Sequence, residues 1–132
     1  MLSELRRSKG HPGVRLAVDA IESDSLFVSV ISVGEIAKGI ALLKESSRNR
    51  RDLQAWLQAL ERLYADRILS IDLETSHTWG ELTAAAQKTG KIVPASDGLI
   101  AATARRHGLH VMTRNVEHFA PTGVLLLNPW TD

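Results

Sequence analysis

Short apolar runs alternate along this chain with longer segments in which apolar residues recur every three or four positions. The short runs are rich in β-branched residues, as buried strands are, and the longer segments have the spacing of helices with one apolar face. Strands are predicted at Leu26–Ile31, Ile68–Ile71, Leu109–Met112 and Val124–Leu127. Helices are predicted at Leu2–Arg7, from Pro12 to Ile21, at Ser32–Lys44, Asp52–Tyr64 and Glu74–Gln87, and from Asp97 to a stop at Gly108. This alternation indicates βαβ units, and therefore an α/β fold with a mostly parallel sheet flanked by helices.

Length and composition narrow the class of protein. The chain has 132 residues, of which 44% are hydrophobic and 23% charged, so a single domain over residues 1–132 is expected. No apolar run approaches the roughly 18 residues that cross a membrane, and the absence of cysteine fits a reducing compartment, so we expect a cytoplasmic protein. The net charge of +1 does not indicate a strong nucleic-acid binder.

Any contact with a polyanion must therefore come from local groups of basic residues. Three such clusters are present, at Arg6–Lys9, Arg48–Arg51 and Arg105–Arg106. Each of them can equally be the solvated end or face of a helix.

Two carboxylates are predicted to meet at one edge of the sheet. Asp97 lies where a helix begins, and Glu35 lies in the first turn of the helix that follows the strand ending at Ile31. The carboxyl ends of parallel strands share one edge of a sheet, and ligands bind there. Carboxylates that meet repel each other unless a cation lies between them, and Mg²⁺ or Mn²⁺ prefers carboxylate, water and phosphate oxygens. The pattern therefore predicts a divalent metal or phosphate site.

The same positions also have local structural interpretations. Ser32 and Glu35 have the spacing of a helix capping box. Ser96 or Asp97 can be a plain N-cap, and residues 113–115 can be a polar loop that leaves a strand. The spacing alone leaves both interpretations open at each position.

Histidine and tryptophan add little to this chemistry. None of the five histidines has the spacing of a zinc site, and we predict no metal role for them. Trp56 and Trp79 stand at helical spacing among apolar residues, so they are expected in the core or at an interface rather than as platforms for stacking bases.

Several short motifs along the chain occur in the order found in a known family. They are Leu2–Arg7, Ser29–Ile36, Asp97–Ala104, Thr113–Asn115 and Asn128–Trp130. As a set they resemble the PIN-domain ribonucleases, in particular the VapC-type toxins of bacterial toxin–antitoxin modules and the FitB-like group among them. The resemblance implies a three-layer fold with a central parallel sheet and a toxin that cleaves RNA with Mg²⁺ or Mn²⁺. It also implies a cognate VapB-type antitoxin and a homodimer.

The resemblance also assigns roles to residues. It makes Glu35 and Asp97 the second and third of four acidic residues that hold the metal ion. Asn115 stands where many relatives have the fourth acid, and it is expected to support catalysis or position substrate. The hydroxyl groups of Ser32 and Thr113 are expected to support the same site.

The chain departs from the family pattern at two places. Relatives whose strand ends in Thr-Arg-Asn often have an acid three residues later, where this chain has His118, and the neighbouring Glu117 is the alternative carboxylate. The family begins with a central strand that ends in Asp-Thr-Asn, whereas this chain starts at Met1, directly before the helix that follows that strand. We therefore expect the first strand and its Asp to be absent, and Met1 to be an internal residue of a longer frame. The alternative is a catalytically defective PIN-like protein that binds an antitoxin or dimerises without cleaving RNA.

Overall fold

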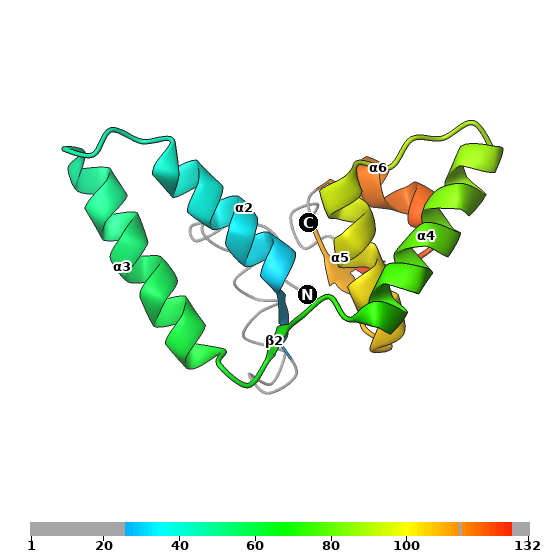
Figure 1. Ribbon diagram of the computed structural model, residues 1–132, viewed down its shortest axis with the longest axis horizontal. Coiled ribbons are helices and arrows are strands. Elements are labelled where there is room, and N and C mark those ends of the chain that lie inside the picture. Colours follow the sequence, from blue (N-terminus) through cyan, green and yellow to red (C-terminus); the bar gives the residue numbers. More distant parts are fainter. Residues whose placement is uncertain (1–25, 114, 128–132) are drawn as a thin grey trace.

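The computed structural model describes residues 26–113 and 115–127, in which helices alternate with short strands (Figure 1). The strands are β1 (Val28–Ser29), β2 (Ile68–Leu69), β3 (Val111–Met112) and β4 (Leu126–Leu127). The helices are α2 (Val30–Ala41), α3 (Arg48–Leu63), α4 (Leu73–Lys88), α5 (Ala95–Arg106), α6 (Val116–Phe119) and the 3₁₀ turn η2 (Ala120–Thr122). The helices predicted before residue 26, the basic cluster at Arg6–Lys9 and the motif Asn128–Trp130 lie outside the described residues.

All strand pairing is parallel, as the alternation of elements predicts. Strand β1 pairs with β2, and β3 pairs with β4. Between residues 26 and 127 the structure describes these pairs as two separate sheets rather than one continuous sheet. The α/β class and the parallel direction are confirmed, and each strand is shorter than the apolar run that predicted it.

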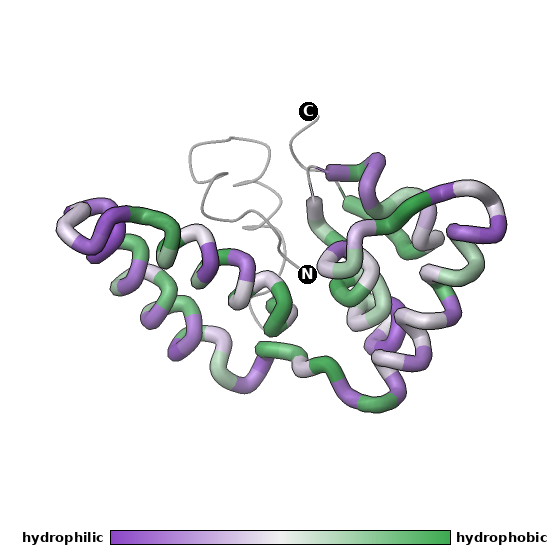
Figure 2. The backbone as a smooth tube through the Cα atoms, turned by 45° about the horizontal axis from the view of Figure 1, so that its top comes forward, coloured by the Kyte–Doolittle hydropathy of each residue, from purple (hydrophilic) through white to green (hydrophobic). Residues whose placement is uncertain are grey.

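The helices form two groups. Helices α2 and α3 make an antiparallel hairpin on one side, and α4, α5 and α6 pack together on the other (Figure 1). Hydrophilic residues gather at the far end of the hairpin, where residues 44–51 are all polar or charged (Figure 2). Among the described helices, none is long and apolar enough to cross a membrane.

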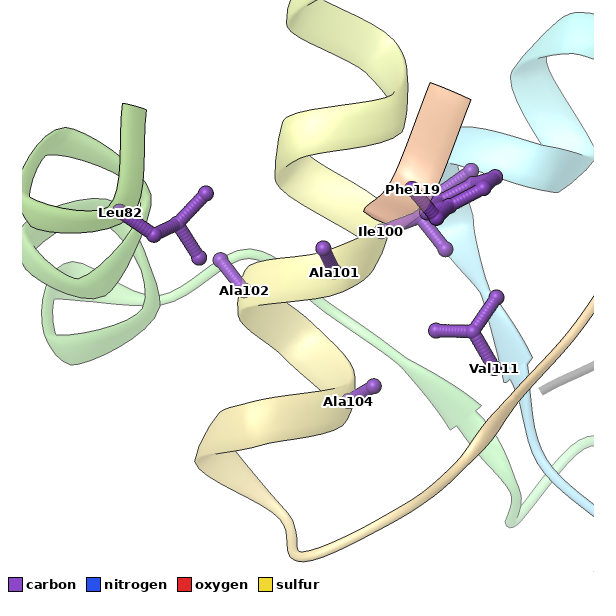
Figure 3. Close-up of a cluster of buried hydrophobic side chains, with 7 residues drawn as sticks. All are labelled: Leu82, Ile100, Ala101, Ala102, Ala104, Val111 and Phe119. Atoms are coloured by element: carbon purple, nitrogen blue, oxygen red, sulfur yellow. The ribbon is translucent and has the colours of Figure 1, made fainter. Parts of the chain in front are cut away.

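Helix α5 is the centre of the larger core cluster. Ala101, Ala102 and Ala104 have no exposed surface, so at these positions α5 meets its neighbours through methyl groups. Larger side chains fill the space around them, namely Leu82, Ile100, Val111 and Phe119 (Figure 3). Small residues let helix backbones approach closely, and α4 makes the most extensive contact with α5.

A second cluster joins the hairpin to the strands. It contains Val28 of β1, Leu60 of α3 and Met112 of β3, so side chains from both strand pairs share one core. Trp56 packs against this cluster and Trp79 against the larger one. Both tryptophans are partly buried, which agrees with the prediction that they lie in the core or at an interface.

The prediction for the start of α2 is wrong. The run Leu26–Ile31 was expected to be a strand and Ser32 to open the helix, but α2 begins at Val30. The cap is Ser29, whose Oγ accepts a hydrogen bond from the Ile31 N–H at 3.1 Å. This cap and the packing of Ile31 against the core override the β preference of the apolar run. Ser32 is therefore inside the helix, and the capping-box interpretation fails.

The stop of α5 is close to the prediction. The helix ends at Arg106, with His107 as C-cap and Gly108 at φ +66°, a conformation that glycine adopts without strain. The Leu109 N–H donates to the Ala104 carbonyl at 2.8 Å, which closes the turn as in a Schellman motif.

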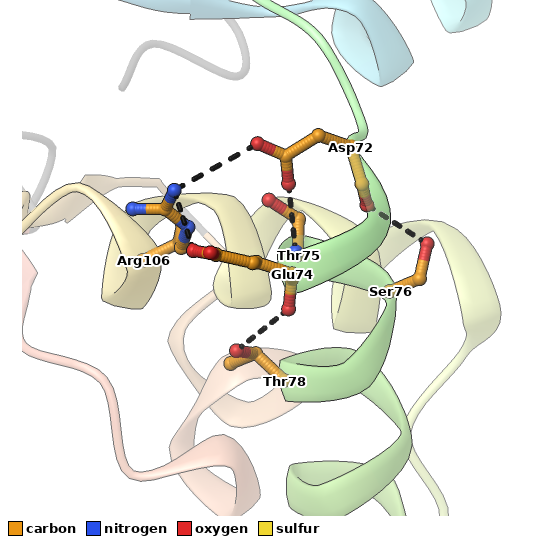
Figure 4. Close-up of polar contacts among 6 residues, drawn as sticks. All are labelled: Asp72, Glu74, Thr75, Ser76, Thr78 and Arg106. Carbon is orange, nitrogen blue, oxygen red and sulfur yellow. Dashed lines mark hydrogen bonds and ion pairs between the residues drawn. The ribbon is translucent and has the colours of Figure 1, made fainter.

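The end of α5 is tied to the start of α4 (Figure 4). Arg106 Nη2 lies 2.6 Å from Glu74 Oε2 and 3.9 Å from Asp72 Oδ2. Asp72 also caps α4 by accepting a hydrogen bond from the Thr75 N–H at 2.8 Å. Hydrogen bonding by Thr75, first by its side chain and then by its backbone, lowers the pKa of the Asp72 carboxyl. Arg106 therefore pairs with carboxylates at the end of a helix. This agrees with the interpretation of the Arg105–Arg106 cluster as a helix end.

Substituting Gly98 tests the close approach of α4 and α5. A Cβ at Gly98 would lie 2.9 Å from Trp79 Nε1, so Gly98→Ala is expected to lower the free energy of unfolding by about 1–3 kcal/mol. The control is Gly80→Ala, at an exposed site on α4 with no atom within 4 Å of the added methyl group. It is expected to raise that free energy by about 0.5–1 kcal/mol, because alanine favours the helix. Urea unfolding measures both, and equal effects of the two changes would contradict the packing.

Candidate metal centre

Asp97 lies in the first turn of α5, as predicted. The N-cap residue is Pro94, which provides no side-chain cap, so neither Ser96 nor Asp97 is the plain N-cap that the sequence left open. The Asp97 side chain is only 16% exposed. Burial raises the pKa of the Asp97 carboxyl, and the nearby His118 imidazole opposes part of that rise. The carboxylate is thus free of a capping role and lies in a partly desolvated position.

Glu35 comes to the same place from α2. Because α2 begins at Val30, Glu35 lies in the second turn of the helix and not in the first, which corrects the prediction. Burial raises the pKa of the Glu35 carboxyl, and the negative charge of Asp97 raises it further. The Ser96 hydroxyl donates a hydrogen bond to Glu35 and, with Lys38, lowers its pKa. The structure therefore brings Glu35 and Asp97 close enough to repel each other.

The hydroxyl residues predicted to support the site have different positions. Ser32 is buried on α2, one turn before Glu35, and among the described residues its hydroxyl has no hydrogen-bond partner. Thr113 is fully buried at the end of β3, where its N–H donates to the Leu127 carbonyl at 3.0 Å. Its Oγ1 accepts a hydrogen bond from the Asn115 N–H at 3.0 Å. Thr113 therefore shapes the loop that leads from β3 to α6.

Among the described residues of α6, His118 is the one that contacts Asp97. Asn115 precedes α6 and Glu117 lies on it, both exposed to solvent. It is His118 whose Nδ1 lies 3.4 Å from Asp97 Oδ2. His118 stands at the position where the family pattern places an acid, and that coincidence was the one signal in the sequence that pointed to it. The contact between Ser96 and Glu35 was also missed, because it joins two helices far apart in the chain.

The donor chemistry of this centre fits a small divalent cation. Mg²⁺ is commonly bound by one or two carboxylates, with water and substrate phosphate completing its shell. Glu35 and Asp97 supply two carboxylates whose mutual repulsion such a cation would relieve. Within residues 26–113 and 115–127, no three Asp, Glu, His or Cys side chains are arranged to hold an ion by themselves. A cation here would therefore depend on water and phosphate for the rest of its ligands.

Comparison with known proteins places the chain in a family. Residues 2–123 match the PIN domain. The chain is 35% identical to VapC ribonuclease Y4jK of Sinorhizobium fredii, over 98% of this chain and 93% of that protein. It is 32% identical to Toxin FitB of Neisseria gonorrhoeae, over 100% of this chain and 95% of that protein. The crystal structure of FitAcB from Neisseria gonorrhoeae superposes with a TM-score of 0.88 at 30% identity, and the match covers 100% of both chains.

The chain belongs to the PIN domain family. The resemblance inferred from its short motifs is confirmed, and so is the PIN-like α/β fold.

Removing one carboxylate tests the electrostatics of the pair. Because the pKa of Glu35 is raised, the folded chain binds that proton more tightly than the unfolded chain. The stability that Glu35 contributes is therefore greatest below about pH 4 and is lost as pH rises through its ordinary and then its raised pKa. We expect Glu35→Gln to become progressively more stable than the unsubstituted chain between pH 4 and pH 7, measured by urea unfolding in EDTA.

The control is Glu61→Gln, which removes an exposed carboxylate of α3. Its effect on stability is expected to change less with pH. A Glu35→Gln chain that is less stable than the unsubstituted chain at pH 7 would contradict the repulsion between Glu35 and Asp97.

Proposed function

We propose that this protein is the toxin of a toxin–antitoxin pair and an endoribonuclease that depends on Mg²⁺ or Mn²⁺. The observation that carries the proposal is the meeting of Glu35 and Asp97 at one point of a PIN domain. Two relatives support it by name, one as a VapC ribonuclease and one as a toxin. The substrate class is RNA, and the bond cleaved is a phosphodiester.

Glu35 and Asp97 are the residues that would hold the cation. When bound, such an ion lowers the pKa of a water ligand and offsets charge on the phosphate. The chain's own part is to hold two carboxylates in a partly desolvated place, where electrostatic interactions are stronger than in bulk water. The Ser96 hydroxyl donates to Glu35 and so favours its charged form, which is the form that binds a cation.

Basic residues near the start of α3 are the best candidates for guiding RNA. Arg48 and Arg51 are exposed there, whereas Arg50 donates to the Leu43 carbonyl at 2.9 Å and Arg106 is paired with Glu74. Contacts to phosphate are weakened by salt. We therefore expect cleavage to decline as the salt concentration rises.

A cognate antitoxin of the VapB type is the proposed protein partner, together with a second copy of the chain. The antitoxin is supported by the similarity to Toxin FitB and to the FitAcB structure along the whole chain. A cytoplasmic location would suit a toxin that acts on cellular RNA.

The test is cleavage of a labelled RNA by the full chain, with Mn²⁺ or with EDTA. Cleavage is expected with the metal and not with EDTA. Asp97→Asn and Glu35→Gln should each reduce the rate by at least about 100-fold, the scale on which loss of one stabilising group acts. Glu61→Gln on α3 removes an exposed carboxylate away from the site and should cleave like the unsubstituted chain.

Unchanged cleavage by Asp97→Asn would contradict the assignment of the site. Absence of Mn²⁺-dependent cleavage by the unsubstituted chain, with antitoxin binding retained, would favour the catalytically defective PIN-like protein instead.

A further inference from the structure

His118 has an exposed side chain but lies next to a buried residue. The side chain is 57% exposed, but the next residue, Phe119, is 2% exposed and belongs to the larger core cluster (Figure 3). The backbone between α6 and η2 is therefore anchored by the core, and His118 is presented from a fixed position. This anchoring fixes the backbone from which the His118 side chain reaches Asp97.

The contact engages one of the two Asp97 oxygens. His118 Nδ1 lies 3.4 Å from Oδ2, and charge and hydrogen bonding from the imidazole counter the rise that burial causes in the pKa of Asp97. At Glu35 the Ser96 hydroxyl has the same effect, because its hydrogen bond lowers the pKa of the Glu35 carboxyl. Each carboxylate of the pair thus has a polar neighbour from the protein itself, and the one at Asp97 contacts Oδ2.

We propose that His118 is a positioning residue of the metal centre, which contacts Asp97 Oδ2 and so keeps the carboxylate oriented for the cation. This inference rests on the proposed function, because it requires a cation at Glu35 and Asp97. Groups that hydrogen bond to metal ligands orient them, and their loss typically lowers metal affinity about 10- to 100-fold.

His118 could have two other roles, as a metal ligand or as a cation that competes with the metal, and the structure argues against both. As a metal ligand, its imidazole would have to converge with both carboxylates, yet the described residues contain no such group of three. As a competing cation, His118 would have to leave Asp97 when the metal binds, although Phe119 anchors the position from which it reaches Asp97.

The experiment measures the affinity of the full chain for Mn²⁺. Binding is monitored during the titration by calorimetry and by the electron paramagnetic resonance signal of free Mn²⁺. His118→Ala is expected to weaken Mn²⁺ binding about tenfold. His118→Asn places an amide N–H close to where Nδ1 lies and should restore most of the affinity. His77→Ala, at an exposed site on α4, is the control and should bind like the unsubstituted chain. Thermal unfolding of each variant establishes that it is folded.

The outcomes separate the inference from the proposed function. Unchanged or tighter Mn²⁺ binding by folded His118→Ala would overturn the positioning role and leave the proposed metal site intact. An imidazole nitrogen in the electron spin echo spectrum of bound Mn²⁺ would also overturn it, because His118 would then be a ligand. Failure of the unsubstituted chain to bind Mn²⁺ would instead contradict the proposed function.

Discussion

The burial of helix α5 is the constraint on which the rest of the structure depends. Its alanines at 101, 102 and 104 are fully enclosed, and their small side chains let neighbouring elements pack closely around the helix. Gly98 extends this small surface to the first turn, where the Trp79 indole fills the space that a Cβ would need. Asp97 is the residue before Gly98, so the packing that fixes the helix also fixes the carboxylate.

The candidate centre lies where the two helix groups meet. Asp97 comes from the group of α4, α5 and α6, and Glu35 comes from the α2–α3 hairpin. Burial disfavours the charged form of both carboxylates and raises the pKa of each, and the negative charge of Asp97 raises the pKa of Glu35 further. The Ser96 hydroxyl and the His118 imidazole offset only part of that penalty. A site that binds a cation is expected to hold such unrelieved repulsion in its metal-free form.

The alternation of apolar runs was enough to predict the parallel α/β class, and Gly108 was enough to predict where α5 stops. The start of α2 could not be predicted in the same way. Its β-branched residues suit a strand or a buried helix equally well, and the choice depended on a hydrogen bond from the Ile31 N–H to Ser29.

The site was predicted in part. The first turn of α5 placed Asp97 correctly, because a helix start can be read from local sequence. The contacts of His118 and Ser96 join segments distant in the chain, so they depend on tertiary packing that no local pattern contains. The roles assigned to Asn115, Glu117 and Ser32 remain predictions.

The central claim is that Glu35 and Asp97 together bind one divalent cation. Crystals of the full chain grown with Mn²⁺, with diffraction data that record the anomalous signal of manganese, test it most directly. We expect an anomalous peak within about 2.5 Å of a carboxylate oxygen of each residue, the range of metal–oxygen bonds for such ions. A well-occupied manganese peak that touches neither carboxylate would contradict it.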